Sequence, residues 1–143
     1  MNVRQISVFL ENRAGRLASI LQCVTEAQCN LRAMSLSDTS DFGIVRLLVD
    51  DVDRCTETLR SRGHTYSVTE MVAIEMDDRP GGLNKVLDAI TAADLNVEYM
   101  YAFATRTPGK AVVIFRFEDN SVAVPALASA GFPNLTEEQI RAL

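Results

Sequence analysis

The sequence predicts an α+β fold built from two copies of one small domain. Three observations lead to this prediction: an internal repeat, apolar residues that alternate as in half-buried strands, and apolar residues spaced as on one helix face. Shifting residues 12–34 by 66 positions onto 78–100 gives eight identities in 23 positions, where chance gives about one or two. The identical pairs are Arg13/Arg79, Gly15/Gly81, Leu17/Leu83, Leu21/Leu87, Thr25/Thr91, Ala27/Ala93, Asn30/Asn96 and Met34/Met100.

Each copy begins with a strand followed by a helix. Residues 3–10 and 71–77 alternate apolar and polar side chains, as half-buried strands do. Their covered faces are expected to hold Ile6, Val8 and Leu10 in the first copy and Val72, Ile74 and Met76 in the second. The helices carry apolar residues at i, i+3, i+4 and i+7, which form one stripe against a sheet. These stripes are Leu17, Ile20, Leu21 and Val24, then Leu83, Val86, Leu87 and Ile90.

A hairpin follows the first helix of each copy. The strands are predicted at residues 31–37 and 44–49, then at 97–104 and 111–118, with polar turns at 38–42 and 105–110.

A second helix then carries Val52, Cys55 and Leu59 on its apolar side and ends at Gly63. Its counterpart is predicted at about 121–130, with Pro125 near the first turn, where a missing N–H is tolerated.

The two copies are predicted to end differently. A closing strand is predicted at about 65–70 in the first copy. In the second, Thr136 to Gln139 has the pattern of a capping box that opens a short helix, so we expect an irregular end. The order βαββαβ is the ferredoxin-like arrangement, an antiparallel sheet with both helices on one face. The predicted domains are residues 1–70 and 71–143.

Composition narrows the class of protein. The chain has 143 residues, 48% of them hydrophobic, and a net charge of −5, without an apolar run long enough for a membrane span. We therefore expect a soluble, cytoplasmic protein that binds neither membranes nor nucleic acid. No two of Cys23, Cys29 and Cys55 form a C-x-x-C pair, so we interpret them as reduced packing thiols and expect no metal site and no cofactor.

Two loops, residues 11–17 and 77–83, lead from the opening strand into the first helix and contain glycine. Glycine allows close backbone approach, and the exposed N–H groups of a helix start attract a carboxylate. Neither Leu17 nor Leu83 is preceded by a Ser or Thr cap, which leaves some of these donors available unless Asn12 or Asp78 caps the helix from further back. Asn30 and Asn96 open the next strand 18 residues after positions 12 and 78, and we expect the two ends to lie near one another.

The strings E-N-R-A-G-R-L with C-N-L, and D-D-R-P-G-G-L with L-N-V, resemble the ACT domain, a small regulatory module that binds amino acids. The resemblance covers about residues 3–70 and 71–137. It implies an amino acid at the interface of two paired modules, with its carboxylate on loop amides and its ammonium group on polar side chains. The implied ligand-binding residues are Asn12, Ala14, Gly15, Arg16, Leu17 and Asn30 in the first copy, and Asp78, Pro80, Gly81, Gly82, Leu83 and Asn96 in the second.

The two copies depart from this pattern in different ways. Ala14 stands where the family commonly has proline, and Asp78 stands where the first copy has Asn12. A charge-assisted hydrogen bond is about twice as strong as a neutral one. We therefore expect the second loop to be the better acceptor for an ammonium group.

Several alternatives stay open at this level. Glycine in both loops serves a tight turn equally well, and Asn30 and Asn96 suit left-handed helix ends. The aromatic residues Tyr99, Tyr101 and Phe103 share one strand face, but the surrounding acidic charge disfavours RNA binding.

The expected function is a non-catalytic sensor that binds an amino acid at the interface of tandem ACT domains and acts through a homodimer or a partner enzyme. One alternative is a regulatory subunit like the small subunit of acetolactate synthase. The other is an acylphosphatase-like enzyme that uses the loop of Arg13 together with Arg16 and Asn30.

Overall fold

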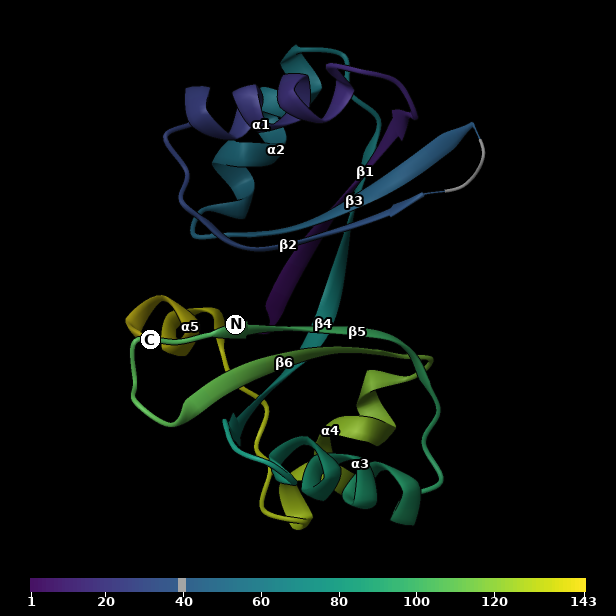
Figure 1. Ribbon diagram of the computed structural model, residues 1–143, viewed down its shortest axis with the longest axis vertical. Helices are drawn as coiled ribbons and strands as arrows, with labels where there is room; N and C mark the ends of the chain where they lie inside the picture. The colour runs from purple at the N-terminus through teal and green to yellow at the C-terminus, as the bar shows by residue number, and fades with distance from the viewer. Residues whose placement is uncertain (39–40) are drawn as a thin grey trace. The chain divides into compact units, whose positions relative to one another are not determined.

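The computed structural model describes residues 1–38 and 41–143, so residues 39 and 40 of the predicted 38–42 turn lie outside the described part (Figure 1). Contacts divide the chain into two compact units. The N-terminal unit is Arg4–Thr69, and the C-terminal unit joins Met1–Val3 to Glu70–Leu143.

The N-terminal unit has the predicted βαββαβ order. Its elements are β1 (Val3–Glu11), α1 (Arg16–Glu26), β2 (Leu31–Asp38), β3 (Phe42–Val49), α2 (Val52–Ser61) and the first residues of β4 (Tyr66–Asp77). Neighbouring strands follow the order β2-β3-β1-β4, and β3 pairs antiparallel with both β1 and β2. One buried cluster takes Ile6 and Val8 from β1, Ile20 and Val24 from α1, and Leu59 from α2. Both helices therefore cover the same sheet face, as predicted (Figure 1).

The C-terminal unit repeats this pattern. It contains the remainder of β4, then α3 (Gly82–Ala92), β5 (Val97–Ala104), β6 (Lys110–Phe117), α4 (Asn120–Ser129) and α5 (Glu137–Ala142). Its strand order is β4-β6-β5, again antiparallel. The buried cluster holds the predicted residues Val72, Ile74, Val86 and Ile90, together with Leu127 of α4. The prediction of two ferredoxin-like copies is confirmed.

The C-terminal unit ends irregularly, as predicted. Instead of a regular fourth strand, the N–H of Leu135 donates to the carbonyl of Ala73 at 2.8 Å, and Asn2 forms an isolated bridge with Thr136. The predicted capping box is present, because the Thr136 hydroxyl accepts the N–H of Gln139 while the Gln139 side chain accepts the N–H of Thr136. Helix α5 starts there.

One predicted detail is wrong. Helix α4 begins at Asn120, with Asp119 as its N-cap, so Pro125 lies inside the helix and not in its first turn. The earlier start follows from the Asp119 side chain, which accepts the N–H of Ser121 at 2.9 Å. Phe115 and Phe117 belong to the core, with ring centroids 5.5 Å apart.

The aromatic residues of β5 belong to the other sheet face. Tyr99 and Tyr101 stand opposite Arg116 and Ile114, which alternate with the two core phenylalanines of β6. The aromatic residues of β5 and β6 therefore do not form one surface on which bases could stack.

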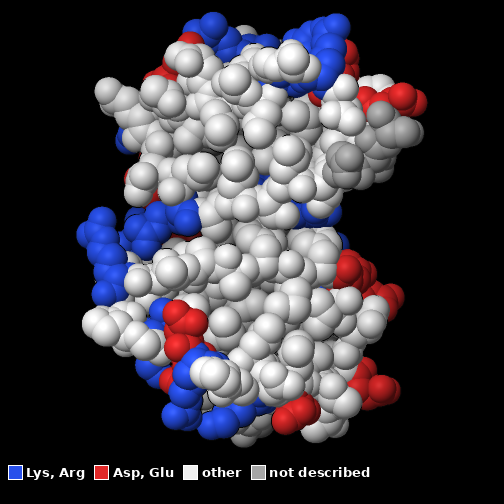
Figure 2. Space-filling view, viewed as in Figure 1, with Lys and Arg blue, Asp and Glu red and all other residues white. Residues whose placement is uncertain are grey.

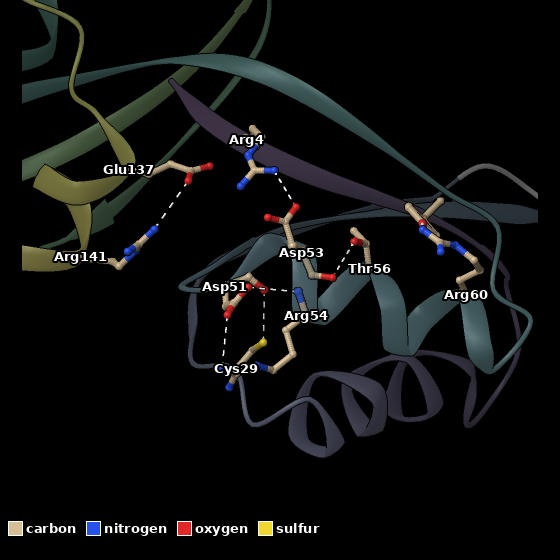
Figure 3. Close-up of polar contacts among 10 residues, drawn as sticks. Arg4, Cys29, Asp51, Asp53, Arg54, Thr56, Arg60, Glu137 and Arg141 are labelled. Carbon is tan, nitrogen blue, oxygen red and sulfur yellow. Dashed lines mark hydrogen bonds and ion pairs between the residues drawn. The ribbon is translucent and has the colours of Figure 1, made fainter. Parts of the chain in front are cut away.

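The three cysteines are free thiols in the N-terminal unit. Burial raises the pKa of Cys55 to about 12. The Cys29 thiol donates to the carbonyl oxygen of Asp51 at 3.3 Å, and the Asp51 side chain caps α2 (Figure 3). These contacts fit packing thiols. No helix among the described residues is long and apolar enough to cross a membrane.

Candidate functional site: two glycine loops and their clefts

The two glycine loops have the same backbone conformation. Gly15 has φ 87° and ψ −12°, and Gly81 has φ 85° and ψ −7°, both in the left-handed region that favours glycine. Each is the N-cap of its helix, and neither α1 nor α3 has a side-chain cap. The absence of a side-chain cap, expected from the sequence, is confirmed at both helices.

Several loop amides remain without a protein acceptor. In the N-terminal unit, the bonded N–H groups are those of Asn12 to Asp41, Arg13 to Glu11 and Arg16 to Arg13, at 2.9, 2.9 and 3.3 Å. Those of Ala14, Gly15 and Leu17 have no acceptor among the described residues.

The second loop leaves a similar set of donors. Asp78 donates to Gly109 and Gly82 to Arg79, both at 2.9 Å, whereas the N–H groups of Gly81 and Leu83 have no acceptor within residues 1–38 and 41–143. Each loop therefore presents open donors where the helix dipole is positive.

A cleft opens beside each loop. The N-terminal cleft, of about 260 Å³, is lined by Phe9, Leu10, Glu11, Arg16, Phe42, Gly63, His64 and Thr65. The C-terminal cleft, of about 320 Å³, is lined by Glu75, Met76, Asp77, Gly82, Lys85, Lys110, Gly131, Phe132, Pro133 and Leu135. The two clefts occupy matching positions, because Glu11 and Asp77 end the opening strands and Gly63 and Gly131 follow the second helices.

The clefts differ at the first residue of their helices. In the C-terminal unit this residue is Gly82, where an added Cβ would collide with the carbonyl oxygen of Asp77. In the N-terminal unit it is Arg16. The second loop is thus wound more tightly against the end of its strand, and the first cleft gains a guanidinium group.

An ion pair between Asp77 and Lys110 keeps both side chains charged in the C-terminal cleft. The Asp77 carboxylate accepts from Lys110 Nζ at 2.7 Å and lies 3.3 Å from Arg79 Nη2. The hydrogen bond and the charge of Lys110 lower the pKa of Asp77, and the same contact raises the pKa of Lys110. Lys85, which also lines this cleft, forms no ion pair with a described residue.

The N-terminal cleft has the same combination of charges. Glu11 pairs with Arg13 at 3.1 Å, while Arg16 forms no ion pair within the described part of the chain. Each cleft therefore joins a carboxylate, an uncommitted cation and open N–H donors, a set that complements the two charges of a free amino acid.

The predicted site residues lie partly where expected. Arg16 and Gly82 line the clefts. The others in the loops lie next to these two residues without lining either cleft; they are Asn12, Ala14, Gly15 and Leu17, and Asp78, Pro80, Gly81 and Leu83.

The predicted proximity of Asn30 to Asn12, and of Asn96 to Asp78, is wrong within each unit. Glu11 stands opposite Phe42 at the start of β3, whereas Leu31 stands opposite Val49 at its end. An eight-residue strand separates the two by roughly 24 Å. Helix α1 runs back along the sheet, so β2 starts at the end of the sheet opposite the glycine loop.

The same register holds in the C-terminal unit, where Asp77 stands opposite Lys110 and Val97 opposite Phe117. Asn30 and Asn96 are also not the left-handed helix ends; Gln28 and Asp94 are, each with φ 55°. The Asn30 N–H instead donates to Asp50 Oδ1 at 2.9 Å.

Sequence reasoning missed the carboxylates that line the clefts. Glu11 and Asp77 are 66 positions apart, the period of the repeat, and that shared acidic position was the available signal. His64, the single histidine of the sequence, is half-buried and also lines the N-terminal cleft. Lys110 reaches its cleft only through the hairpin register, which the sequence does not show.

The sequence of this chain matches a family described as an ACT domain pair over residues 1–139. The chain belongs to the ACT domain pair family. The predicted resemblance is confirmed, and the two glycine loops stand at matching places in this ACT domain pair. ACT domains are regulatory modules. None of the curated proteins is similar enough in sequence to count as a relative.

Solved structures agree with this membership. The crystal structure of protein BT0572 from Bacteroides thetaiotaomicron is 31% identical, with a TM-score of 0.91 over 100% of this chain and 98% of that chain. The regulatory subunit of aspartate kinase from Thermus thermophilus, in a ligand-free form, is 17% identical, with a TM-score of 0.64 over 91% and 93%. The regulatory subunit from Thermus flavus is also 17% identical, with a TM-score of 0.60 over 92% and 94%. The two aspartate kinase subunits share the fold of this ACT domain pair.

Proposed function

We propose that this ACT domain pair is a non-catalytic sensor that binds a free amino acid at its glycine loops and regulates a partner. One observation carries the proposal: each loop leaves N–H donors open beside a cleft that holds an uncommitted cation and a carboxylate. Either loop can receive a carboxylate without breaking a hydrogen bond of the protein.

In the N-terminal cleft, the ligand carboxylate accepts from the N–H groups of Gly15 and Leu17 and pairs with Arg16. Its ammonium group then faces Asn12, because Glu11 is held by Arg13. In the C-terminal cleft, the carboxylate lies on Gly81 and Leu83 beside Lys85. Its ammonium group then faces Asp78, because Asp77 is held by Lys110.

We propose that a second module completes this site. Asn30 and Asn96 lie at the far end of the sheet from the loop of their own unit. An asparagine that contacts the ammonium group must therefore come from a different module. This requirement supports the predicted binding between paired modules and a homodimer or partner enzyme.

The experiment is a thermal-shift screen against the twenty amino acids, followed by calorimetry on each that shifts the midpoint. Ligand at 100 times its dissociation constant adds about 2.7 kcal/mol of stability. We expect Asp78→Ala to weaken binding more than Asn12→Ala, and Asp88→Ala, an exposed control on α3, to leave it unchanged. Failure of all twenty amino acids to bind would exclude the sensor.

We propose that amino-acid binding changes either the activity of a partner enzyme or the self-association of this chain. Two of the similar solved structures are regulatory subunits of aspartate kinase, which supports a partner enzyme. A regulatory subunit like that of acetolactate synthase remains the second form of this proposal. Light scattering with and without the amino acid found in the screen distinguishes assembly by this chain alone from dependence on a partner.

The acylphosphatase-like alternative has little support. It needs the loop arginines and Asn30 around one phosphate, yet Asn30 lies at the opposite end of β3 from Arg13 and Arg16. Arg13 is moreover held by Glu11 at 3.1 Å. Incubation with acetyl phosphate tests this alternative. Hydrolysis by the wild-type protein that is lost in Arg13→Ala would support the enzyme.

A further inference from the structure

A second cleft of the N-terminal unit lies away from the glycine loop, along one side of α1. Arg16, Ser19, Gln22 and Glu26 line it at helical spacing, and Arg62 and His64 close it from the chain that follows α2. We call it the helix groove; its volume is about 310 Å³. Arg16 and His64 line the N-terminal cleft as well, so the two spaces adjoin.

The helix groove gathers cationic and hydrogen-bonding groups. It holds two guanidinium groups, an imidazole, a hydroxyl and a side-chain amide against a single carboxylate. Glu26 and Arg62 pair with each other at 2.7 Å, so one of the two guanidinium groups shares its charge with this carboxylate, whereas Arg16 has no ion pair among the described residues. Figure 2 shows Lys and Arg atoms along the edge where Figure 1 draws α1 and α2.

The duplication provides an internal comparison. Shifting α1 by 66 positions brings Gln22 onto Asp88 and Glu26 onto Ala92, while alignment of Gly63 with Gly131 brings Arg62 onto Ala130 and His64 onto Phe132. Both units fold alike around these positions. The fold therefore does not require these particular polar groups of the helix groove.

We infer that the helix groove binds the phosphate group of a small molecule. Guanidinium groups pair with phosphate through parallel hydrogen bonds, and a dianion gains more from two of them than a single carboxylate does. The hydroxyl of Ser19 and the amide of Gln22 can donate to the remaining oxygens. The volume leaves room for the group that carries the phosphate. This inference goes beyond the amino-acid site and does not depend on it.

The test uses inorganic phosphate, glycerol 3-phosphate and AMP at constant ionic strength, with no amino acid present. We expect saturable binding in calorimetry and amide shifts confined to residues 16–26 and 62–64. Tighter binding of the esters indicates a phosphorylated metabolite, and tighter binding of inorganic phosphate indicates the free anion; both support the groove. No saturable binding of any probe overturns it.

Three variants separate the groove from general charge effects. Arg62→Gln should weaken binding by about tenfold or more. Glu26→Gln, which removes the only carboxylate, should tighten it. Arg54→Gln is the matched control, because Arg54 pairs with Asp51 at 3.4 Å on α2, outside the groove. Equal effects of Arg62→Gln and Arg54→Gln, or no tightening by Glu26→Gln, would overturn the inference.

Discussion

Replacing Gly82 by alanine tests the tight winding of the second loop. The new Cβ would collide with the carbonyl oxygen of Asp77, a backbone atom that cannot rotate away as a side chain can. Overpacking of this kind costs roughly 1–3 kcal/mol, and the helix propensity of alanine returns at most about 1 kcal/mol. We therefore expect Gly82→Ala to destabilise the C-terminal unit by about 1–2 kcal/mol.

Urea unfolding and calorimetry measure this effect. For a unit of this size, each kcal/mol lowers Tm by about 4–8 °C. Arg16→Ala is the matched control, because the same position of the repeat already carries a Cβ, and it should change stability by less than about 0.5 kcal/mol. An unchanged unfolding midpoint in Gly82→Ala would refute the steric reasoning.

Three further perturbations have expected outcomes. Because the pKa of Asp77 is lowered and that of Lys110 raised, their pairing should stabilise the fold fully between about pH 4 and pH 10. It should be lost as the pH falls through the folded pKa of Asp77, and carboxyl NMR titration should give a higher Asp77 pKa in Lys110→Met. With a pKa of about 12, Cys55 should not react with a thiol reagent at pH 8 until the protein unfolds, as a timed absorbance assay would show. Thr136→Ala should cost about 1 kcal/mol and speed amide exchange within α5.

Much of the fold could be predicted because local patterns determine it. The stripe of Leu17, Ile20 and Val24 predicts α1, and the capping box at Thr136 predicts the helix that ends the chain. Pro125 misled the prediction, because a proline usually marks a first turn and here lies inside α4. Because the sequence pattern occurs in both copies, each helix and strand predicted in one copy is supported by its counterpart in the other.

The site was only partly predictable. Backbone conformation at Gly15 and Gly81 follows from residue type, and so does the lack of a side-chain cap. The end of the sheet that a residue occupies follows from the direction of the chain through the preceding helix, and this direction places Asn30 and Asn96 at the end away from the glycine loops. The contact of Lys110 with Asp77 depends on hairpin register, for which no local pattern exists.

The bare starts of α1 and α3 have a consequence for how a signal could arise. A helix whose N-cap is glycine gives up about a few tenths of a kcal/mol relative to one with a Ser or Asp cap, and its first turn frays more readily. A carboxylate bound there would act as a removable cap supplied from solution. The concentration of the amino acid would then determine how rigid the first turns of α1 and α3 are, before any larger movement of the protein takes place.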